Sequence, residues 1–252
     1  MDRDRRALGV ALLAVLAAGI PARATATEAV APPAWQAIAP GAERATLGSD
    51  PPVRLYRFDL TRFRAEVVVG AGRPPAAETA GALVASGRAV AAVNGGFFDE
   101  HVAPLGLRIA GGQVRAALRA HADWGVLLLT ADRARIIHTR DYHAGPEVRG
   151  AIQVGPRLLV GGAPLTLKPQ RARRTAVALD RDGRTLTLVV ADDPIEAGEL
   201  AARLAAAGFD AALMLDGGPS TQLALDLGGV RVDLPGGYPV PDLLAIVSAT
   251  RR

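Results

Sequence analysis

The sequence predicts a single α+β domain built on a mixed, mostly antiparallel sheet with a few helices. Short runs rich in β-branched and aromatic residues recur along the chain, and several of them face each other across turn-forming residues. Only two segments show the helical spacing of apolar residues. A doubly wound fold is disfavoured, because it requires a helix after almost every strand.

The first predicted strands are short, and the first predicted helix follows them. Residues 53–58 and 65–69 are β-rich runs separated by polar, turn-forming residues. Residues 78–86, closed by Gly87, form a short helix. This helix leads into an apolar strand that starts at Ala89.

Three hairpins are predicted where two such runs flank a short polar or glycine-rich turn. The paired segments are 105–109 with 113–115, 126–130 with 135–139, and 175–179 with 185–190. Because hairpin strands are antiparallel, these pairs account for most of the expected sheet.

The second predicted helix precedes a second apolar strand. Leu200 and Leu204 recur at helical spacing, Glu199 lies four residues before Arg203, and Gly208 follows as a C-terminal stop. The helix therefore ends at this glycine and leads into the strand that starts at residue 211.

The first 26 residues have the pattern of a secretory signal peptide. Arginines near the start precede an apolar run at 7–20, and small residues at 22–26 suit cleavage. The run is shorter than the roughly 20 residues that span a bilayer, so cleavage is favoured over the alternative of a retained anchor. No stable membrane span is expected after cleavage, and the mature protein is expected to be periplasmic or secreted.

The remaining chain is divided into a lead-in and one domain. Residues 27–50 are expected to form a tether and N-terminal lead-in, poorly ordered over 27–40, and residues 51–252 the folded domain. A domain of this length can bury a sizeable core. Because the chain has no cysteine, that core alone must stabilise it after export.

The charge of the chain argues against a nucleic-acid partner. The formal net charge is +4, and cleavage after Ala26 removes four arginines and two aspartates, which leaves +2. Lys168 is the single lysine, and the basic residues do not cluster on one predicted face. We therefore expect no nucleic-acid partner.

Two turns of similar build form the predicted functional site. An apolar run at 89–93 leads into Asn94-Gly95-Gly96-Phe97-Phe98-Asp99, and one at 211–215 leads into Asp216-Gly217-Gly218-Pro219-Ser220-Thr221. Glycine lets the backbone adopt a positive φ and approach a ligand closely. Ordinary hairpin turns also contain Asn-Gly and Asp-Gly, but they do not need the residues that follow these glycines.

Further candidates lie at the ends of the 175–190 hairpin. Arg174 enters an apolar strand beside Thr175, and a guanidinium offers a fork of donors for phosphate or carboxylate. Asp192 ends its strand as Asp216 does, so the two carboxylates could share one site and take different acid and base roles. The alternative for Asp192 is a helix cap or turn residue.

Several other chemistries lack their residue patterns. The four histidines show no metal-ligand spacing, Ser220 has no recognisable histidine partner, and the glycine turns do not match nucleotide-binding fingerprints. No cofactor is expected. A divalent cation held by Asp192, Asp193 and Asp216 is the alternative.

The ordered motifs resemble those of the phosphodiester glycosidase family. The matching segments, in chain order, are Asn94-Gly-Gly-Phe-Phe-Asp99, Pro104-Leu-Gly-Leu107, Gly155-Pro-Arg-Leu-Leu159, Arg174-Thr-Ala176, Val189-Val-Ala-Asp192 and Leu215-Asp-Gly-Gly-Pro-Ser-Thr221. The resemblance runs from about residue 56 to 244. The chain departs from the pattern at Pro219, where relatives carry glycine, and at Asp193-Pro194, where Gly-Arg is often seen.

The resemblance implies an exported hydrolase that cleaves the glycosidic bond of a sugar-1-phosphodiester in envelope or extracellular polysaccharide. It implies catalytic roles for Asp216, Asp192 and Arg174, with Asn94 orienting a sugar hydroxyl or phosphate oxygen. The expected substrate-binding residues are Asn94, Gly95, Gly96, Phe97, Asp99, Thr175, Gly217, Gly218, Ser220 and Thr221. The alternatives are a non-catalytic envelope protein of the same fold that binds anionic glycan, and a structural envelope protein.

Overall fold

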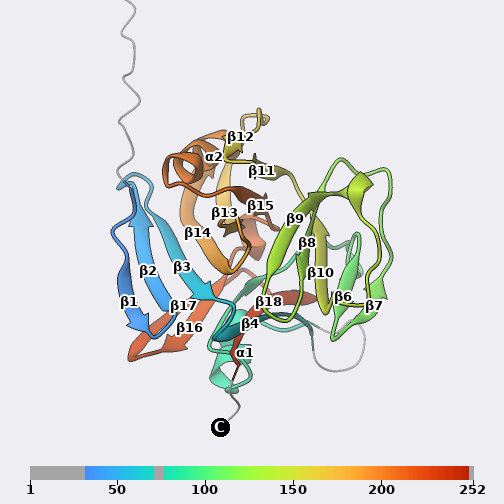
Figure 1. The fold of residues 1–252 in the computed structure, drawn as a ribbon, viewed down its shortest axis with the longest axis horizontal. Coiled ribbons are helices and arrows are strands. Elements are labelled where there is room, and N and C mark those ends of the chain that lie inside the picture. Colours follow the sequence, from blue (N-terminus) through green and yellow to red (C-terminus); the bar gives the residue numbers. More distant parts are fainter. Residues whose placement is uncertain (1–31, 71–76, 250–252) are drawn as a thin grey trace, which may run out of the picture.

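Antiparallel β-sheets make up most of the computed structural model, which describes residues 32–70 and 77–249 (Figure 1). The predicted signal peptide lies outside these residues. Every strand pair found in the described part of the chain is antiparallel. The fold is therefore mostly β with a few helices.

The largest sheet has eight strands in the order β1-β2-β3-β14-β13-β15-β11-β12. Their bounds are β1 Gln36–Ala39, β2 Ala42–Leu47, β3 Val53–Asp59, β14 Thr185–Glu196, β13 Arg171–Leu179, β15 Ala211–Met214, β11 Arg157–Val160 and β12 Ala163–Pro164. The long hairpin of β13 and β14 forms its centre, and β15 pairs with the other edge of β13.

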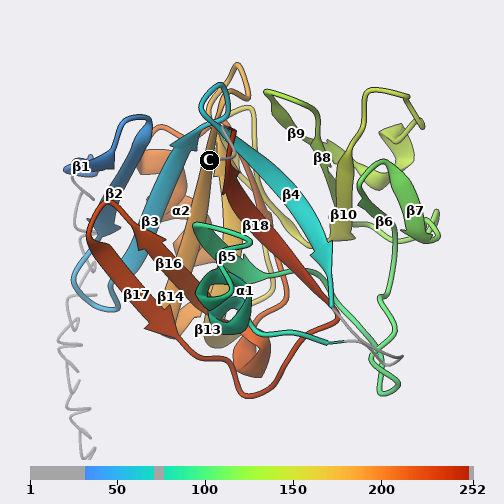
Figure 2. The ribbon, with the colours of Figure 1, turned by 90° about the horizontal axis from the view of Figure 1, so that it is seen from below.

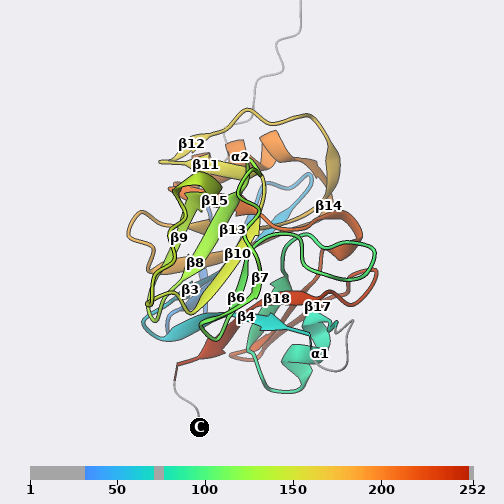
Figure 3. The same ribbon diagram turned by 90° about the vertical axis from the view of Figure 1, so that its right-hand side faces the viewer.

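Two five-stranded sheets complete the fold. One has the order β7-β6-β10-β8-β9, with β6 Arg108–Ala110, β7 Gln113–Ala116, β8 Gly125–Leu129, β9 Ala134–His138 and β10 Gly150–Val154. The other has the order β17-β16-β5-β18-β4, with β4 Phe63–Val69, β5 Ala91–Asn94, β16 Leu223–Leu227, β17 Val230–Leu234 and β18 Asp242–Ser248. In Figure 3 the first of these sheets faces the viewer.

Two α-helices cover outer faces of the sheets. Helix α1 (Ala80–Ala85) lies against the sheet that contains β5 (Figure 2). Leu83 packs against this sheet, and Thr79 caps the start of the helix. Helix α2 (Ala197–Ala206) packs Leu200 and Leu204 against the eight-stranded sheet. Short 3₁₀ turns occur at η1 (Thr139–Asp141) and η2 (Gly218–Ser220).

The main core lies between the three sheets. Phe58 and Val177 of the eight-stranded sheet meet Leu127 and Leu244 of the two smaller sheets there, all of them buried. Alternate residues of the same long strands, such as Leu55 and Ala176, instead face α2 in a second core. Because side chains alternate along a strand, the eight-stranded sheet is apolar on both faces.

The structure corrects the predicted architecture. The strands form three antiparallel sheets rather than one mixed sheet. Residues 36–47, assigned to the tether and lead-in, form β1 and β2 in the eight-stranded sheet, where Ala42, Ala45 and Leu47 are buried. Both helices and all three hairpins are confirmed.

The described residues contain no helix with the length and apolar composition needed to cross a bilayer.

Candidate functional site

The two glycine turns meet at one place in the structure. The side-chain Nδ2 of Asn94 donates a hydrogen bond to the backbone carbonyl of Asp216 at 2.7 Å. The backbone N–H of Asp216 in turn donates to the carbonyl of Gly95 at 3.0 Å. The ends of β5 and β15, which belong to different sheets, are therefore joined directly at the first residues of their turns.

Asn94 is fully buried and acts as the hub of this junction. Its Oδ1 accepts a hydrogen bond from Thr175 Oγ1 at 2.7 Å and lies 3.3 Å from the backbone nitrogen of Gln222. Since its amide is bonded to protein on both ends, Asn94 does not present a group to a ligand. In this structure Asn94 and Thr175 are bonded to each other and to the two turns, and their contacts with substrate remain a prediction.

Asp216 offers a partly exposed carboxyl group at the junction. Its Oδ1 accepts from the backbone N–H of Gly217 at 2.9 Å, and its Oδ2 accepts from Ser220 Oγ at 2.6 Å. Burial raises the pKa of this carboxyl above its usual range. The two hydrogen bonds lower the pKa but do not cancel the effect of burial, so the group is a suitable proton acceptor or donor.

The second turn places its other residues around this carboxyl. Gly218 adopts φ of 58°, in the left-handed region, and begins the 3₁₀ turn that brings Ser220 back to Asp216. Ser220 Oγ also lies 3.3 Å from the hydroxyl of Tyr238, which is exposed. Thr221 is buried, and its hydroxyl has no hydrogen-bond partner in the described residues.

A buried ion pair supports the first turn, and sequence reasoning missed it. Arg108 Nε lies 2.9 Å from Asp242 Oδ2, and neither side chain is exposed. Asp242 Oδ1 accepts from the N–H of Gly96 at 3.0 Å, while an Nη of Arg108 donates to the carbonyl of Phe97 at 3.1 Å. Asp242 is also a second carboxylate near Asp216, whose pKa it raises further.

The buried ion pair of Arg108 and Asp242 requires both glycines of the first turn. A Cβ on Gly95 would lie 1.8 Å from Asp242 Oδ1, and a Cβ on Gly96 would lie 2.1 Å from Arg108 Nη2. Neither glycine has a positive φ, so close approach explains them. The sequence held one signal for each residue. Arg108 places a charge inside the apolar run 107–109, and Asp242 places one directly before the apolar run 243–247.

Arg174 points away from the Asn94 hub. In β13, Thr175 faces the junction, and the neighbouring Arg174 faces the side covered by α2. Its Nε donates to the carbonyl of Ile195 at 3.3 Å, and an Nη donates to the carbonyl of Gln170. It still adjoins the second turn, because its Cδ is 3.9 Å from where a Cβ of Gly217 would lie.

Asp192 and Asp99 have other partners. Asp192 Oδ1 lies 2.5 Å from an Nη of Arg173, across the hairpin of β13 and β14. Asp99 Oδ1 accepts from the N–H groups of His101 and Ala103 at 2.9 Å each, which closes the loop after the first turn. The backbone N–H of Ala103 lowers the pKa of the Asp99 carboxyl.

Aromatic rings flank the junction. Phe97 packs edge-on against Trp124 with ring centroids 5.2 Å apart, and Phe98 packs against Tyr238 at 6.0 Å. In the described part of the chain, no three His, Cys, Asp or Glu side chains gather as they would around a metal ion, so Asp192, Asp193 and Asp216 do not form the cluster considered above.

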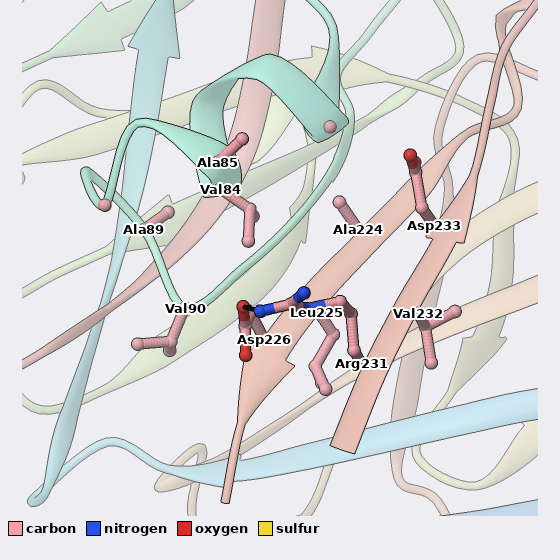
Figure 4. Close-up of a pocket in the computed structure, with 12 residues that line it drawn as sticks. Val84, Ala85, Ala89, Val90, Ala224, Leu225, Asp226, Arg231, Val232 and Asp233 are labelled. Carbon is pink, nitrogen blue, oxygen red and sulfur yellow. Dashed lines mark hydrogen bonds and ion pairs between the residues drawn. The ribbon is translucent and has the colours of Figure 1, made fainter. Parts of the chain in front are cut away.

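A cavity elsewhere in the structure does not involve these residues. It has about 540 Å³ between α1 and the hairpin of β16 and β17, and Figure 4 shows Asp226 and Arg231 paired on its wall. Neither glycine turn lines it. The junction of the turns therefore remains the candidate site.

A sequence profile of the phosphodiester glycosidase family matches residues 87–247. The matched segment covers more than half of the chain and includes both glycine turns. The chain belongs to the phosphodiester glycosidase family. This confirms the family resemblance seen in the ordered motifs.

Three solved structures share the fold of this family member. The catalytic domain of zebrafish N-acetylglucosamine-1-phosphodiester alpha-N-acetylglucosaminidase, auto-inhibited by its pro-peptide, has a TM-score of 0.64 at 17% identity, over 89% of this chain and 85% of that one. A hypothetical protein from Synechocystis has a TM-score of 0.60 at 17% identity, over 86% and 64%. A Burkholderia pseudomallei K96243 protein, described as a candidate exported protein, has a TM-score of 0.57 at 16% identity, over 81% and 74%.

These identities of 16–17% to the three solved structures show a common fold.

One curated relative, the uncharacterized protein YigE of Escherichia coli (strain K12), is 33% identical over 84 residues. That match covers 30% of this chain and spans about a third, 33%, of the length of YigE.

Proposed function

We propose that this protein is an exported hydrolase that cleaves the glycosidic bond of a sugar-1-phosphodiester in envelope or extracellular polysaccharide. The observation that carries the proposal is the Asp216 carboxyl, partly buried and with a raised pKa, at the junction of the two glycine turns. Membership of the phosphodiester glycosidase family supports the same reaction class.

The chemistry suits a site with one prominent carboxyl group. Water adds its hydroxyl to C1 of the sugar, the C1–O bond breaks, and the phosphate monoester leaves with the bonding electrons. A phosphate monoester is already a good leaving group, so charge stabilisation matters more than a strong general acid. Asp216 accepts the proton of the attacking water or attacks C1 itself, following the logic of glycosidases.

The groups around Asp216 set its reactivity. Ser220 and the N–H of Gly217 hold the two carboxylate oxygens in place, while burial raises the pKa towards the range where a base works well. Exposed Tyr238 lies at the edge of this site, where a sugar ring could pack against it. Export rests on the signal pattern of residues 1–26.

The test is hydrolysis by the mature protein of a panel of sugar-1-phosphodiesters in ¹⁸O-labelled water. The expected result is free reducing sugar without inorganic phosphate, and label on the C1 hydroxyl. Asp216→Asn serves as the matched inactive control. Label on the phosphate would show P–O cleavage and overturn the glycosidase mechanism.

A second candidate is a non-catalytic protein that binds anionic glycan through the same turns. The observation that favours it is the pairing of Asp192 with Arg173, which leaves Asp216 without Asp192 as a second catalytic carboxylate. Tight binding of an anionic glycan that survives unchanged for many hours, equally in the wild type and in Asp216→Asn, would favour this candidate over the hydrolase.

A further inference from the structure

Arg174 lines a pocket on the α2 side of the eight-stranded sheet. The pocket has a volume of about 310 Å³. Besides Arg174, its walls include Pro156, Thr166, Lys168, Gln170, Ala197 and Met214. Pro156 directly precedes β11, and the others come from the loop between β12 and β13, from the start of α2 and from the end of β15. The pocket is thus distinct from the Asn94 hub, which lies on the other face of β13.

The guanidinium of Arg174 is a buried cation without an acidic partner. Only 5% of the residue is exposed, and its hydrogen bonds go to the carbonyls of Ile195 and Gln170 and, at 3.5 Å, to the sulfur of Met214. No carboxylate lies within 4.0 Å of it in the described residues. Burying an unpaired charge is costly, so an external anion would stabilise this arrangement.

The other buried arginines in the described part of the chain follow a different pattern. Arg108 pairs with Asp242 at 2.9 Å, and Arg203 pairs with Glu199 at 2.5 Å. Burial alone therefore does not explain an arginine without an acid in this protein. Arg174 is the exception among these three buried arginines, and it lines a pocket.

Two further features give the pocket a positive character. Lys168, the single lysine of the chain, lies on its wall with an exposed side chain. Helix α2 begins at the pocket with Ala197, and Glu196 at its N-cap makes no side-chain hydrogen bond to the first turn. The free N–H groups and the dipole at a helix N-terminus attract anions.

We propose that this pocket binds a phosphate-class anion through Arg174, Lys168 and the start of α2. The inference deepens the proposed function and rests on it for the identity of the anion: the phosphodiester group of the substrate, or the phosphate released after further breakdown. The first role is favoured by proximity, because Arg174 Cδ lies 3.9 Å from where a Cβ of Gly217, the residue after Asp216, would lie.

The test is a calorimetric titration of inorganic phosphate into the mature protein, without any turnover. Wild type should bind phosphate saturably, and Arg174→Gln should weaken binding at least about tenfold, as expected for loss of hydrogen bonds to a charged group. Lys168→Gln should weaken it about threefold, since Lys168 is exposed and its charge is screened. Arg181→Gln is the matched control, because its side chain is 91% exposed in the turn between β13 and β14.

Lys168→Gln decides the matter if Arg174→Gln fails to fold, since an exposed side chain can be replaced safely. Equal phosphate affinities for Lys168→Gln and Arg181→Gln, or no saturable binding by wild type, would overturn the proposal. Once a hydrolysed substrate is known, the KM and the inhibition constant of phosphate can be compared between Lys168→Gln and wild type. If both constants rise by the same factor in Lys168→Gln, the diester binds in the pocket. If only the inhibition constant rises, free phosphate binds there.

The proposal and the proposed function fail in different ways. Phosphate binding that depends on Lys168, in a protein that hydrolyses no phosphodiester, would leave the pocket standing and remove the enzyme. If the wild type hydrolyses the diester and Lys168→Gln has unchanged kinetics and phosphate affinity, the proposed function stands and the phosphate pocket is ruled out.

Discussion

Asn94 donates a hydrogen bond from its side-chain amide to the backbone carbonyl of Asp216 at 2.7 Å. This bond joins two strands that are more than a hundred residues apart in the chain and belong to different sheets. The carboxyl of Asp216 is therefore positioned by its own backbone, which leaves its oxygens to Ser220, Gly217 and a reacting molecule.

Asp216→Asn should reduce turnover of a confirmed sugar-1-phosphodiester at least about 10²-fold while the protein stays folded. The amide keeps the volume of the carboxyl and can still accept from the N–H of Gly217, but it cannot take up a proton or attack C1. Steady-state kinetics, with circular dichroism as the folding control, measures both effects. Near-wild-type activity would show that Asp216 is not the catalytic carboxylate.

The same substitution should stabilise the protein against heat near neutral pH. Because the pKa of Asp216 is raised in the folded state, protonation of this carboxyl stabilises the fold. This stabilisation is fully present below the pKa of the unfolded state, about 3.8, and is lost as the pH rises through the higher pKa of the folded state. Above the folded-state pKa the wild type thus carries a partly buried charge that Asp216→Asn lacks. The difference in Tm between the two proteins should shrink as the pH falls towards 3.8, and a constant difference would contradict this account.

Ser220→Ala should shift the pH dependence of the reaction. The hydroxyl of Ser220 donates to Asp216 at 2.6 Å and lowers the pKa of that carboxyl. Without this bond the pKa rises further, so the acidic limb of the kcat/KM profile should move to higher pH, because the reaction requires ionised Asp216. A profile that keeps its position with a lower maximum would instead mean that Ser220 acts on the substrate.

The glycine turns could be predicted from the sequence because their pattern is local. An apolar run, a polar residue and a glycine pair are contiguous, and both turns were found from them. Asp242 could not be placed in this way, because it reaches Gly96 only through the pairing of β18 with β5, which aligns Leu243 with Asn94. No local signal specifies which distant strands become neighbours.

Arg174 shows a different limit of sequence reasoning. Its position at the strand end was predicted, but the face on which its side chain lies depends on register. An irregularity in the pairing of β13 with β14 falls between Ala172 and Arg174, and such a shift changes which residues face each side. The structure thus places Thr175 at the junction and Arg174 in the pocket beside α2.

Asn94→Ala should destabilise the protein by about 3 kcal/mol or more, because it leaves the carbonyl of Asp216, the hydroxyl of Thr175 and the N–H of Gln222 without their buried partner. Urea unfolding measures the loss. Thr175→Ser, which keeps the hydroxyl donor and removes one methyl group, is the matched control and should cost only about 1 kcal/mol. Equal losses in the two variants would show that packing, and not the hydrogen bonds of Asn94, holds the turns together.

Gly96→Ala should destabilise the fold by about 1–3 kcal/mol, the usual cost of overpacking, although alanine adds only one methyl group. Its Cβ would lie 2.1 Å from Nη2 of Arg108, which cannot move aside because it is fully buried and paired with Asp242. Gly198→Ala is the matched control: nothing lies within 4 Å of its Cβ, and alanine in a helix should stabilise by up to about 1 kcal/mol. Thermal unfolding of both variants shows whether each substitution lowers or raises the Tm. A neutral Gly96→Ala would mean that Arg108 can shift within the core, and that its pair with Asp242 is not the rigid support of the first turn.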